Sequence, residues 1–226
     1  MKSPGPLFTL LAGVVLAGGI GITNLATGTG ATPVAGAANA AGAPATSEPP
    51  KTAPPKTSEA PKADAPARAD YAGRADGGGA SVAVSVRDGH AIAYVCDGKK
   101  VEAWLQGVTV GGKLDLKGPK GASLAGSYDT AAVTGSVTAG GTTWRFTAAP
   151  AKKPAGLYRA APKVKGKASK VGWIVQPDGS QVGILTTDDG QSAAAPALDP
   201  AAGTATVDGA PVTAEAISGQ SGSGDF

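Results

Sequence analysis

The stretch Ser81–Gly107, SVAVSVRDGHAIAYVCDGKKVEAWLQG, is the densest run of β-branched and aromatic residues in the chain. Two Asp-Gly pairs, Asp88-Gly89 and Asp97-Gly98, divide it into three segments of strand length. Asp-Gly between apolar runs is typical of a tight β-hairpin, because both residues tolerate the positive φ that such a turn requires. The stretch therefore predicts three antiparallel strands, near residues 80–86, 90–96 and 101–106.

Downstream of this stretch, apolar and polar residues continue to alternate with the period of a strand that has one buried and one wet face. Glycine-rich turns separate these segments at intervals of about 8–12 residues, which favours a β-meander closed as a small barrel or sandwich. Two later segments, 171–175 and 182–185, also have strand character. The predicted core residues are Val82, Val84, Val86, Ile92, Tyr94, Leu105, Leu114, Leu116, Leu124, Val133, Val137, Trp144, Phe146 and Trp173.

Composition limits how much of the chain can form a core. The 226 residues include 35 Gly and 18 Pro, close to the range of low-complexity sequences. All three Trp and all four Tyr lie between positions 71 and 173. We therefore predict one mainly β, antiparallel domain at 70–187, without a helix of ordinary length.

The amino-terminal segment 7–26 is almost entirely apolar and is about as long as a membrane-spanning helix. Lys2 precedes it, and the next charged residue is Glu48, so the positive-inside rule leaves the remaining chain outside the cytoplasm. We predict a short cytoplasmic end at 1–6 and a signal anchor at 7–26, giving a single-pass plasma-membrane protein. Cleavage of the segment as a signal peptide is the alternative, and it would make the protein secreted.

Residues 27–69 form a linker rich in Ala, Pro, Thr, Ser and Lys, with no large hydrophobic residue after Val34. Such a segment buries too little apolar surface to offset the entropy of ordering it. We predict a disordered stalk, biased by its prolines toward extended polyproline II.

The run YAGR…GGGASVAVSVRDGHAIAYVCDGKKVEAWLQG, with the later GLYRA and GWIV…DG, resembles uncharacterised exported or membrane-anchored proteins of actinobacteria that carry a small β domain. The similarity covers about residues 71–184. Its motifs are strand and turn motifs, so the resemblance implies a fold and no particular chemistry.

Residues suited to catalysis or metal binding are scarce. The chain has one His, His90, and one Cys, Cys96, whereas a structural zinc site needs four ligands. Six positions separate the two on one strand, about 20 Å, so they cannot act on one atom within that strand. We predict a surface position for His90 and a buried one for Cys96, with a redox or intermolecular disulfide role for Cys96 as the alternative. The sequence indicates no catalytic residue, metal or cofactor.

The strongest polar feature is a basic segment at 152–170 without any acidic residue, whose members are Lys152, Lys153, Arg159, Lys163, Lys165, Lys167 and Lys170. Residues 188–226 carry six acidic and no basic residues, and we predict a mostly disordered acidic tail there. Three interpretations stay open for the basic segment. It is a solvated loop, a clasp for the acidic tail, or a polyanion-binding site for a cell-wall polymer or anionic lipid; nucleic acid fits the charge and does not fit the location.

These features together predict a non-catalytic exported protein of the cell envelope, with the seven basic residues as its candidate polyanion-binding site. One alternative is a β-barrel that carries a small apolar ligand in a cavity lined by Trp104, Tyr128 or Trp144. The other is an enzyme of unknown type.

Overall fold

The computed structural model describes residues 64–221. These residues belong to one compact unit, Lys56–Phe226. The predicted cytoplasmic end at 1–6, the signal anchor at 7–26 and the linker from 27 to 63 lie outside the described residues. Within 64–221, the structure contains no helix with the length and apolarity needed to cross a bilayer.

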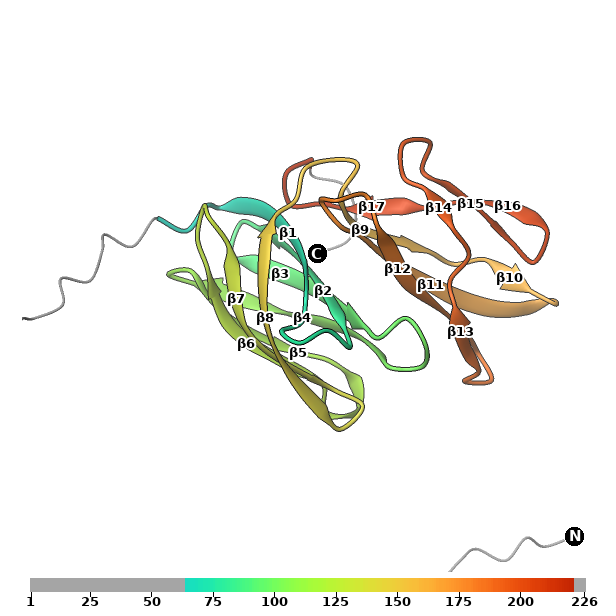
Figure 1. The fold of residues 1–226 in the computed structure, drawn as a ribbon, viewed down its shortest axis with the longest axis horizontal. Coiled ribbons are helices and arrows are strands. Elements are labelled where there is room, and N and C mark those ends of the chain that lie inside the picture. The colour runs from blue at the N-terminus through green and yellow to red at the C-terminus, as the bar shows by residue number, and fades with distance from the viewer. Residues whose placement is uncertain (1–63, 222–226) are drawn as a thin grey trace, which may run out of the picture. The chain divides into compact units, whose positions relative to one another are not determined.

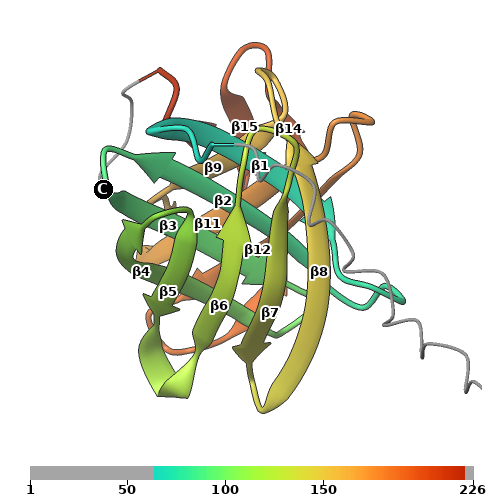
Figure 2. The ribbon, with the colours of Figure 1, turned by 90° about the vertical axis from the view of Figure 1, so that its left-hand side faces the viewer.

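Eight antiparallel strands form a closed barrel, in which each strand pairs with the next along the chain (Figures 1 and 2). Strand β8 closes the ring by pairing with β1 at Tyr71↔Pro150 and Ala72↔Ala149. The predicted antiparallel β fold is thereby confirmed, and the barrel is the form it takes. The strands are β1 (Arg68–Arg74), β2 (Ser81–Arg87), β3 (His90–Cys96), β4 (Glu102–Val110), β5 (Lys113–Lys117), β6 (Ser123–Tyr128), β7 (Val133–Ala139) and β8 (Thr142–Pro150), with a short 3₁₀ turn at Pro119–Gly121 between β5 and β6.

The two Asp-Gly pairs do end strands, but they do so in different ways. Asp88 and Gly89 form a two-residue turn with φ of 49° and 87°, the left-handed geometry that the sequence indicates. At the second pair, the Asp97 carboxylate accepts the backbone N–H groups of 99–101 at 2.7–3.0 Å, so the loop is longer. Strand β4 consequently begins at Glu102.

The barrel interior is filled by side chains from alternate positions of every strand. Val82, Val84 and Val86 of β2 point inward, with Leu105, Leu116 and Phe146 from other strands. Of the residues expected in the core, Trp144 is only half-buried, and it packs against this cluster. Ile92 and Tyr94 are buried as expected, but they lie on the outer face of the barrel, in a second core.

A second sheet covers the outer face of β1, β2 and β3. Its strand order is β13-β12-β11-β9-β17, and β10 pairs with β11 (Figure 1). A third, three-stranded sheet has the order β14-β15-β16. The strands are β9 (Gly156–Ala160), β10 (Lys163–Val164), β11 (Lys167–Val175), β12 (Gln181–Thr187), β13 (Ser192–Ala194), β14 (Leu198–Asp199), β15 (Thr204–Val207), β16 (Ala210–Thr213) and β17 (Glu215–Ile217).

The prediction of a mostly disordered tail is wrong for its described part, residues 188–221. Five of the strands lie there, and β17 pairs with β9, which is more than fifty residues earlier in the chain. The tail gains order because it buries a few apolar side chains, such as Leu198, Val207 and Ile217, against the second sheet and the barrel. The folded domain therefore extends well past the predicted limit at 187.

The barrel and the second sheet share an apolar core built from the outer face of β2 and β3 and from β9, β11, β12 and β17. Tyr94 and Trp104 stack there with ring centroids 4.5 Å apart. Gly172 of β11 lies directly against them, since a Cβ at that position would come within 2.6 Å of the Tyr94 ring. A glycine is required for this close approach of the sheet to the barrel.

The other face of the second sheet packs against the three-stranded sheet. Trp173 is the largest side chain in this third core, and its indole N–H donates a 2.8 Å hydrogen bond to the carbonyl of Pro196. All three cores are built from residues within 64–221, so we expect the unit Lys56–Phe226 to fold by itself.

Candidate functional site

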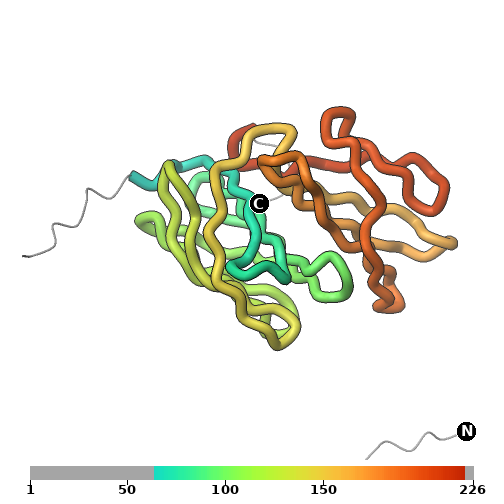
Figure 3. Tube along the Cα trace, in the orientation of Figure 1, coloured from blue at the N-terminus to red at the C-terminus, as the bar shows by residue number. Residues whose placement is uncertain are grey.

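A groove of about 530 Å³ lies where the barrel meets the second sheet. It is formed mainly by three parts of the chain that are distant in sequence: β1, the β8–β9 loop with β9, and β17 with the segment that follows it. Figure 3 shows the backbone of these parts. We call this feature the groove throughout. Its volume is within the range of about 300–1,000 Å³ that is usual for small-molecule sites.

The floor of the groove is apolar. Leu157 of β9 and Ile217 of β17 are buried beneath it, and the half-buried Ala155 lies in its wall. Tyr71 of β1 lines the groove from the other side of β1, where its ring belongs to the barrel interior. The Tyr71 hydroxyl donates a 2.6 Å hydrogen bond to the carbonyl of Asp129, and burial raises the pKa of Tyr71 well above its ordinary value. The phenol is therefore neutral at physiological pH, and the floor carries no charge from this residue.

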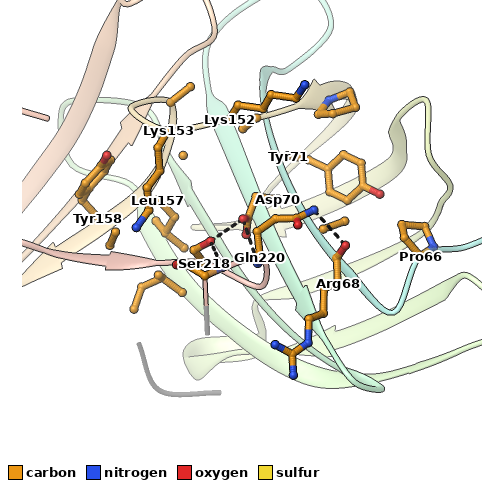
Figure 4. Close-up of a pocket in the computed structure, with 18 of the residues that line it drawn as sticks. Pro66, Arg68, Asp70, Tyr71, Lys152, Lys153, Leu157, Tyr158, Ser218 and Gln220 are labelled. Atoms are coloured by element: carbon orange, nitrogen blue, oxygen red, sulfur yellow. Dashed lines mark hydrogen bonds between the residues drawn. The ribbon is translucent and has the colours of Figure 1, made fainter. Parts of the chain in front are cut away.

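One wall of the groove is the C-terminal segment 218–221, which is fastened to the barrel through Asp70. The buried Asp70 carboxylate accepts hydrogen bonds from the Ser218 hydroxyl at 2.6 Å and from the backbone N–H groups of Gly219 and Gln220 at 2.8 and 3.3 Å. Figure 4 shows Asp70 beside Ser218 and Gln220. The Gln220 side chain donates to the carbonyl of Arg68 at 3.1 Å. Asp70 thus joins two parts of the chain that are about 150 residues apart.

Close contact between the two backbones reinforces this attachment. A Cβ on Gly219 would lie 1.9 Å from the Val86 carbonyl oxygen, so only glycine fits there. The Arg87 guanidinium donates to the carbonyl of Ser218 at 2.7 Å, and the buried Ser85 hydroxyl donates to the carbonyl of Ile217 at 3.0 Å. The segment that follows β17 is an integral wall of the groove.

The β8–β9 loop places two adjacent lysines, Lys152 and Lys153, at the rim. The loop is short and hydrogen-bonded: Ala151 N–H donates to the Asp70 carbonyl at 2.7 Å and Ala155 N–H donates to the Lys152 carbonyl at 2.9 Å. Beside it, the Tyr158 hydroxyl donates to the carbonyl of Pro154 at 2.7 Å. In Figure 4 the side chain of Lys153 extends toward Leu157 and Ser218, and that of Lys152 extends away from them.

Both lysines are exposed, and neither forms an ion pair with a residue in the range 64–221. The third cation of the groove, Arg68, differs because its guanidinium binds both oxygens of Asp88, at 2.6 and 3.3 Å. That contact lowers the pKa of Asp88 and keeps the pair charged. The charge available to a ligand in the groove therefore comes from Lys152 and Lys153.

The structure does not bring the seven predicted basic residues together. Lys152 and Lys153 lie at the groove, whereas Lys163, Lys165 and Lys167 lie on the β10–β11 hairpin, in a different part of the fold (Figure 1). The exposed Lys170 lies further along β11. A segment that is continuous in sequence is divided in space, because β9 runs through it.

The acidic tail forms ion pairs with two of these cations, as the clasp interpretation expects. Arg159 binds Glu215 with a nitrogen–oxygen distance of 3.0 Å, and Lys167 binds Asp189. The backbone N–H of Lys165 donates to the Asp208 carboxylate at 2.9 Å. The contact with Lys167, followed by a hydrogen bond from Thr187, lowers the pKa of Asp189 to about 2. These contacts leave the groove lysines out of the clasp.

A second cavity, of about 300 Å³, lies between Arg74, Cys96, Gln176 and Val182. Its cation is already used, since Arg74 donates to the Asp178 carboxylate at 3.1 Å and also to the Ser180 hydroxyl. The groove is therefore the stronger candidate site for a charged ligand.

His90 and Cys96 lie where the sequence predicts them. His90 is exposed at the start of β3, and Cys96 is a fully buried free cysteine. Burial raises the pKa of the Cys96 thiol to about 12, so the thiol stays protonated at neutral pH. In residues 64–221, no three His, Cys, Asp or Glu side chains are grouped in a way that could hold a metal ion.

Comparison with known proteins gives no assignment, since no family model, curated protein or solved structure matches the chain. The candidate site rests on its own geometry. Sequence reasoning identified Lys152 and Lys153 among seven basic residues, and it missed Asp70, the groove floor and the wall at 218–221. The opposite charge of the basic segment and the tail was a signal for the pairing of Arg159 with Glu215 of β17, and no local signal indicated the wall itself.

Proposed function

We propose that this protein is a non-catalytic, exported protein of the cell envelope, whose β domain binds an anionic envelope component in the groove. The observation that carries the proposal is the pair of exposed lysines, Lys152 and Lys153, at the rim of a concave site and without an ion-pair partner in residues 64–221. Two adjacent ammonium groups favour a bound anion, and a concave site limits its exchange with solvent.

The proposal assigns ligand binding to only two of the seven predicted basic residues, Lys152 and Lys153. Arg159 and Lys167 already have acidic partners, which lowers the charge that they offer to a ligand. Lys163, Lys165 and Lys170 lie away from the groove and serve as matched controls of equal charge. The envelope location follows from the apolar segment at 7–26, and it is part of the proposal.

The alternative of a carrier with its ligand inside the barrel has less support. Valine, leucine, tyrosine and phenylalanine side chains fill the interior. Neither the groove nor the second cavity is lined by Trp104, Tyr128 or Trp144, the residues on which that alternative depends.

Co-sedimentation with anionic and zwitterionic vesicles and with purified cell wall tests the proposal. The sample is the unit Lys56–Phe226, which omits the apolar segment and its own affinity for membranes. We expect binding to an anionic surface that is lost at high salt, because a Debye length of about 3 Å at 1 M ionic strength screens exposed charges.

Two double variants locate the site. Lys152→Gln with Lys153→Gln should lower the bound fraction, whereas Lys163→Gln with Lys170→Gln, which removes the same charge elsewhere, should leave it near that of the wild type. Equal effects of the two double variants, or no binding to any anionic surface at low salt, would contradict the proposal.

A further inference from the structure

We propose that the ligand of the groove is a single-chain amphiphile with a phosphate-monoester headgroup, with its phosphate at Lys152 and Lys153 and its chain along the apolar floor. The inference rests on the proposed function and specifies the class of its ligand. It explains why the two free charges lie above an apolar surface.

The rim favours phosphate over carboxylate. Lysine binds an anion as a point charge, without the fork geometry by which arginine recognises carboxylate and phosphate alike. Two lysines therefore favour the anion with the greater charge, and a phosphate monoester carries about two negative charges at pH 7 where a carboxylate carries one. The arginine of the groove, Arg68, is held by both oxygens of Asp88, so the available cations are ammonium groups. Lys153 extends over the groove toward Leu157 and Ser218, where a headgroup at the rim would meet it (Figure 4).

The floor favours an alkyl chain over a second charged group. Below the rim lie Leu157 and Ile217, and Tyr71, which lines the groove from the side of the barrel interior, is neutral. A polymer with a charge on every unit would place its next anion against these apolar side chains, where it would lose its hydration without gaining a cation.

Asp70 sets the depth of the anion. Its carboxylate lies at the base of the wall and accepts hydrogen bonds from three uncharged donors in 218–220. These groups supply no cation to which a phosphate could bind. The negative charge of Asp70 repels a phosphate placed deep in the groove and leaves an uncharged chain unaffected. The phosphate is therefore confined to the rim, and the chain occupies the floor.

The test is a calorimetric titration of the unit Lys56–Phe226 with alkyl phosphates of four, six, eight and ten carbons, below their micellar concentrations. Inorganic phosphate measures the affinity for the headgroup alone, and decanol measures the affinity for the chain alone. Inorganic polyphosphate measures the affinity for a polyanion without an alkyl chain. Affinity should increase with chain length, up to roughly fourfold for each fully buried methylene. Inorganic phosphate, polyphosphate and decanol should each bind more weakly than decyl phosphate.

Two variants separate the two ends of the ligand. Lys152→Gln with Lys153→Gln should weaken all the alkyl phosphates by about three- to tenfold while keeping their dependence on chain length. Ala155→Leu, which adds volume to the groove wall, should remove that dependence while phosphate binding by the lysines persists. Circular dichroism of each variant confirms that the β-sheet is intact.

The outcomes distinguish this inference from the proposed function. Polyphosphate binding as tightly as decyl phosphate, or affinity independent of chain length, would overturn the amphiphile and leave an anion-binding groove. Absence of binding by every phosphate compound, together with absence of binding to anionic surfaces, would overturn both. Equal binding of decyl phosphate and decanol would show that the lysines have no role, and would overturn the assignment of the headgroup.

Discussion

The barrel and the second sheet are both antiparallel, but they are assembled in different ways. In the barrel every strand from β1 to β8 pairs with its neighbour in sequence, and only the closure of β8 on β1 is long-range. In the second sheet β9 lies between β11 and β17, and β17 comes from the far end of the described chain. The barrel is thus specified locally, whereas the second sheet depends on contacts between distant segments.

This difference shows why a short, weakly apolar segment can still be essential to a fold. Strand β17 has three residues and would be marginal alone. Its position is fixed by β9, by the core that the barrel and the second sheet share at Ile217, and by the Asp70 hydrogen bonds that follow it. The same long-range contacts that order the tail also form the groove. A change that removes the order of the tail is therefore expected to remove the groove as well.

The largest expected effect compares one large core residue in each region. Trp173→Ala in the second sheet and Phe146→Ala in the barrel should each lower the free energy of unfolding by about 3–5 kcal/mol, because each removes a buried aromatic side chain. Urea denaturation followed by far-UV circular dichroism measures both.

The number of steps in the unfolding transition tests whether the barrel and the second sheet unfold together. Since the two regions share the core around Tyr94 and Ile174, both variants should unfold in one cooperative step. A Trp173→Ala variant with unchanged stability, or with a separate early transition, would mean that the second sheet is an independent appendage.

The barrel could be predicted from sequence because its signals are local. Asp88-Gly89 determines a two-residue turn without help from distant residues, and the alternation along Lys113–Lys117 identifies one buried face. The closed form could not be chosen over a sandwich, since both produce the same alternation. Likewise, Ile92 and Tyr94 were recognised as buried, but the pattern could not show that they face a second sheet.

The groove could be predicted only in part. Lys152 and Lys153 were found as members of a basic segment, and nothing local separates them from Lys163 or Lys170. What separates them is β9, whose pairing with β17 directs the chain away from the groove. Asp70 carries no signal at all, because its partners Ser218 and Gly219 lie about 150 residues away. Contacts between residues this far apart form only when the chain folds, so no local sequence pattern indicates them.

The smallest expected effect concerns Asp178, which links the β11–β12 turn to β1. Hydrogen bonds from the Ser180 side chain and backbone, followed by the contact with Arg74, lower the pKa of Asp178 from 3.8 to about 2. A carboxyl group with a lowered pKa stabilises the folded state above its unfolded value and loses this contribution as the pH falls toward the folded value.

The stability difference between the wild type and an Asp178→Asn variant should accordingly be constant above about pH 4 and should shrink as the pH falls from about 4 to about 2. Urea titrations at several pH values measure it, and a carboxyl NMR titration follows Asp178 directly. A difference that stays constant down to pH 2 would mean that neither Ser180 nor Arg74 stabilises the Asp178 carboxylate in the folded protein.

The most direct test of the account is amide hydrogen exchange at Gly219 and Gln220, the N–H groups bound by Asp70. If the segment after β17 is an integral wall of the groove, Gly219 should exchange orders of magnitude more slowly than an unstructured peptide, in the range of the β17 amides, with weaker protection at the exposed Gln220. Exchange of both amides at unstructured rates, while β2 and β3 stay protected, would contradict the account and would leave the groove without one of its walls.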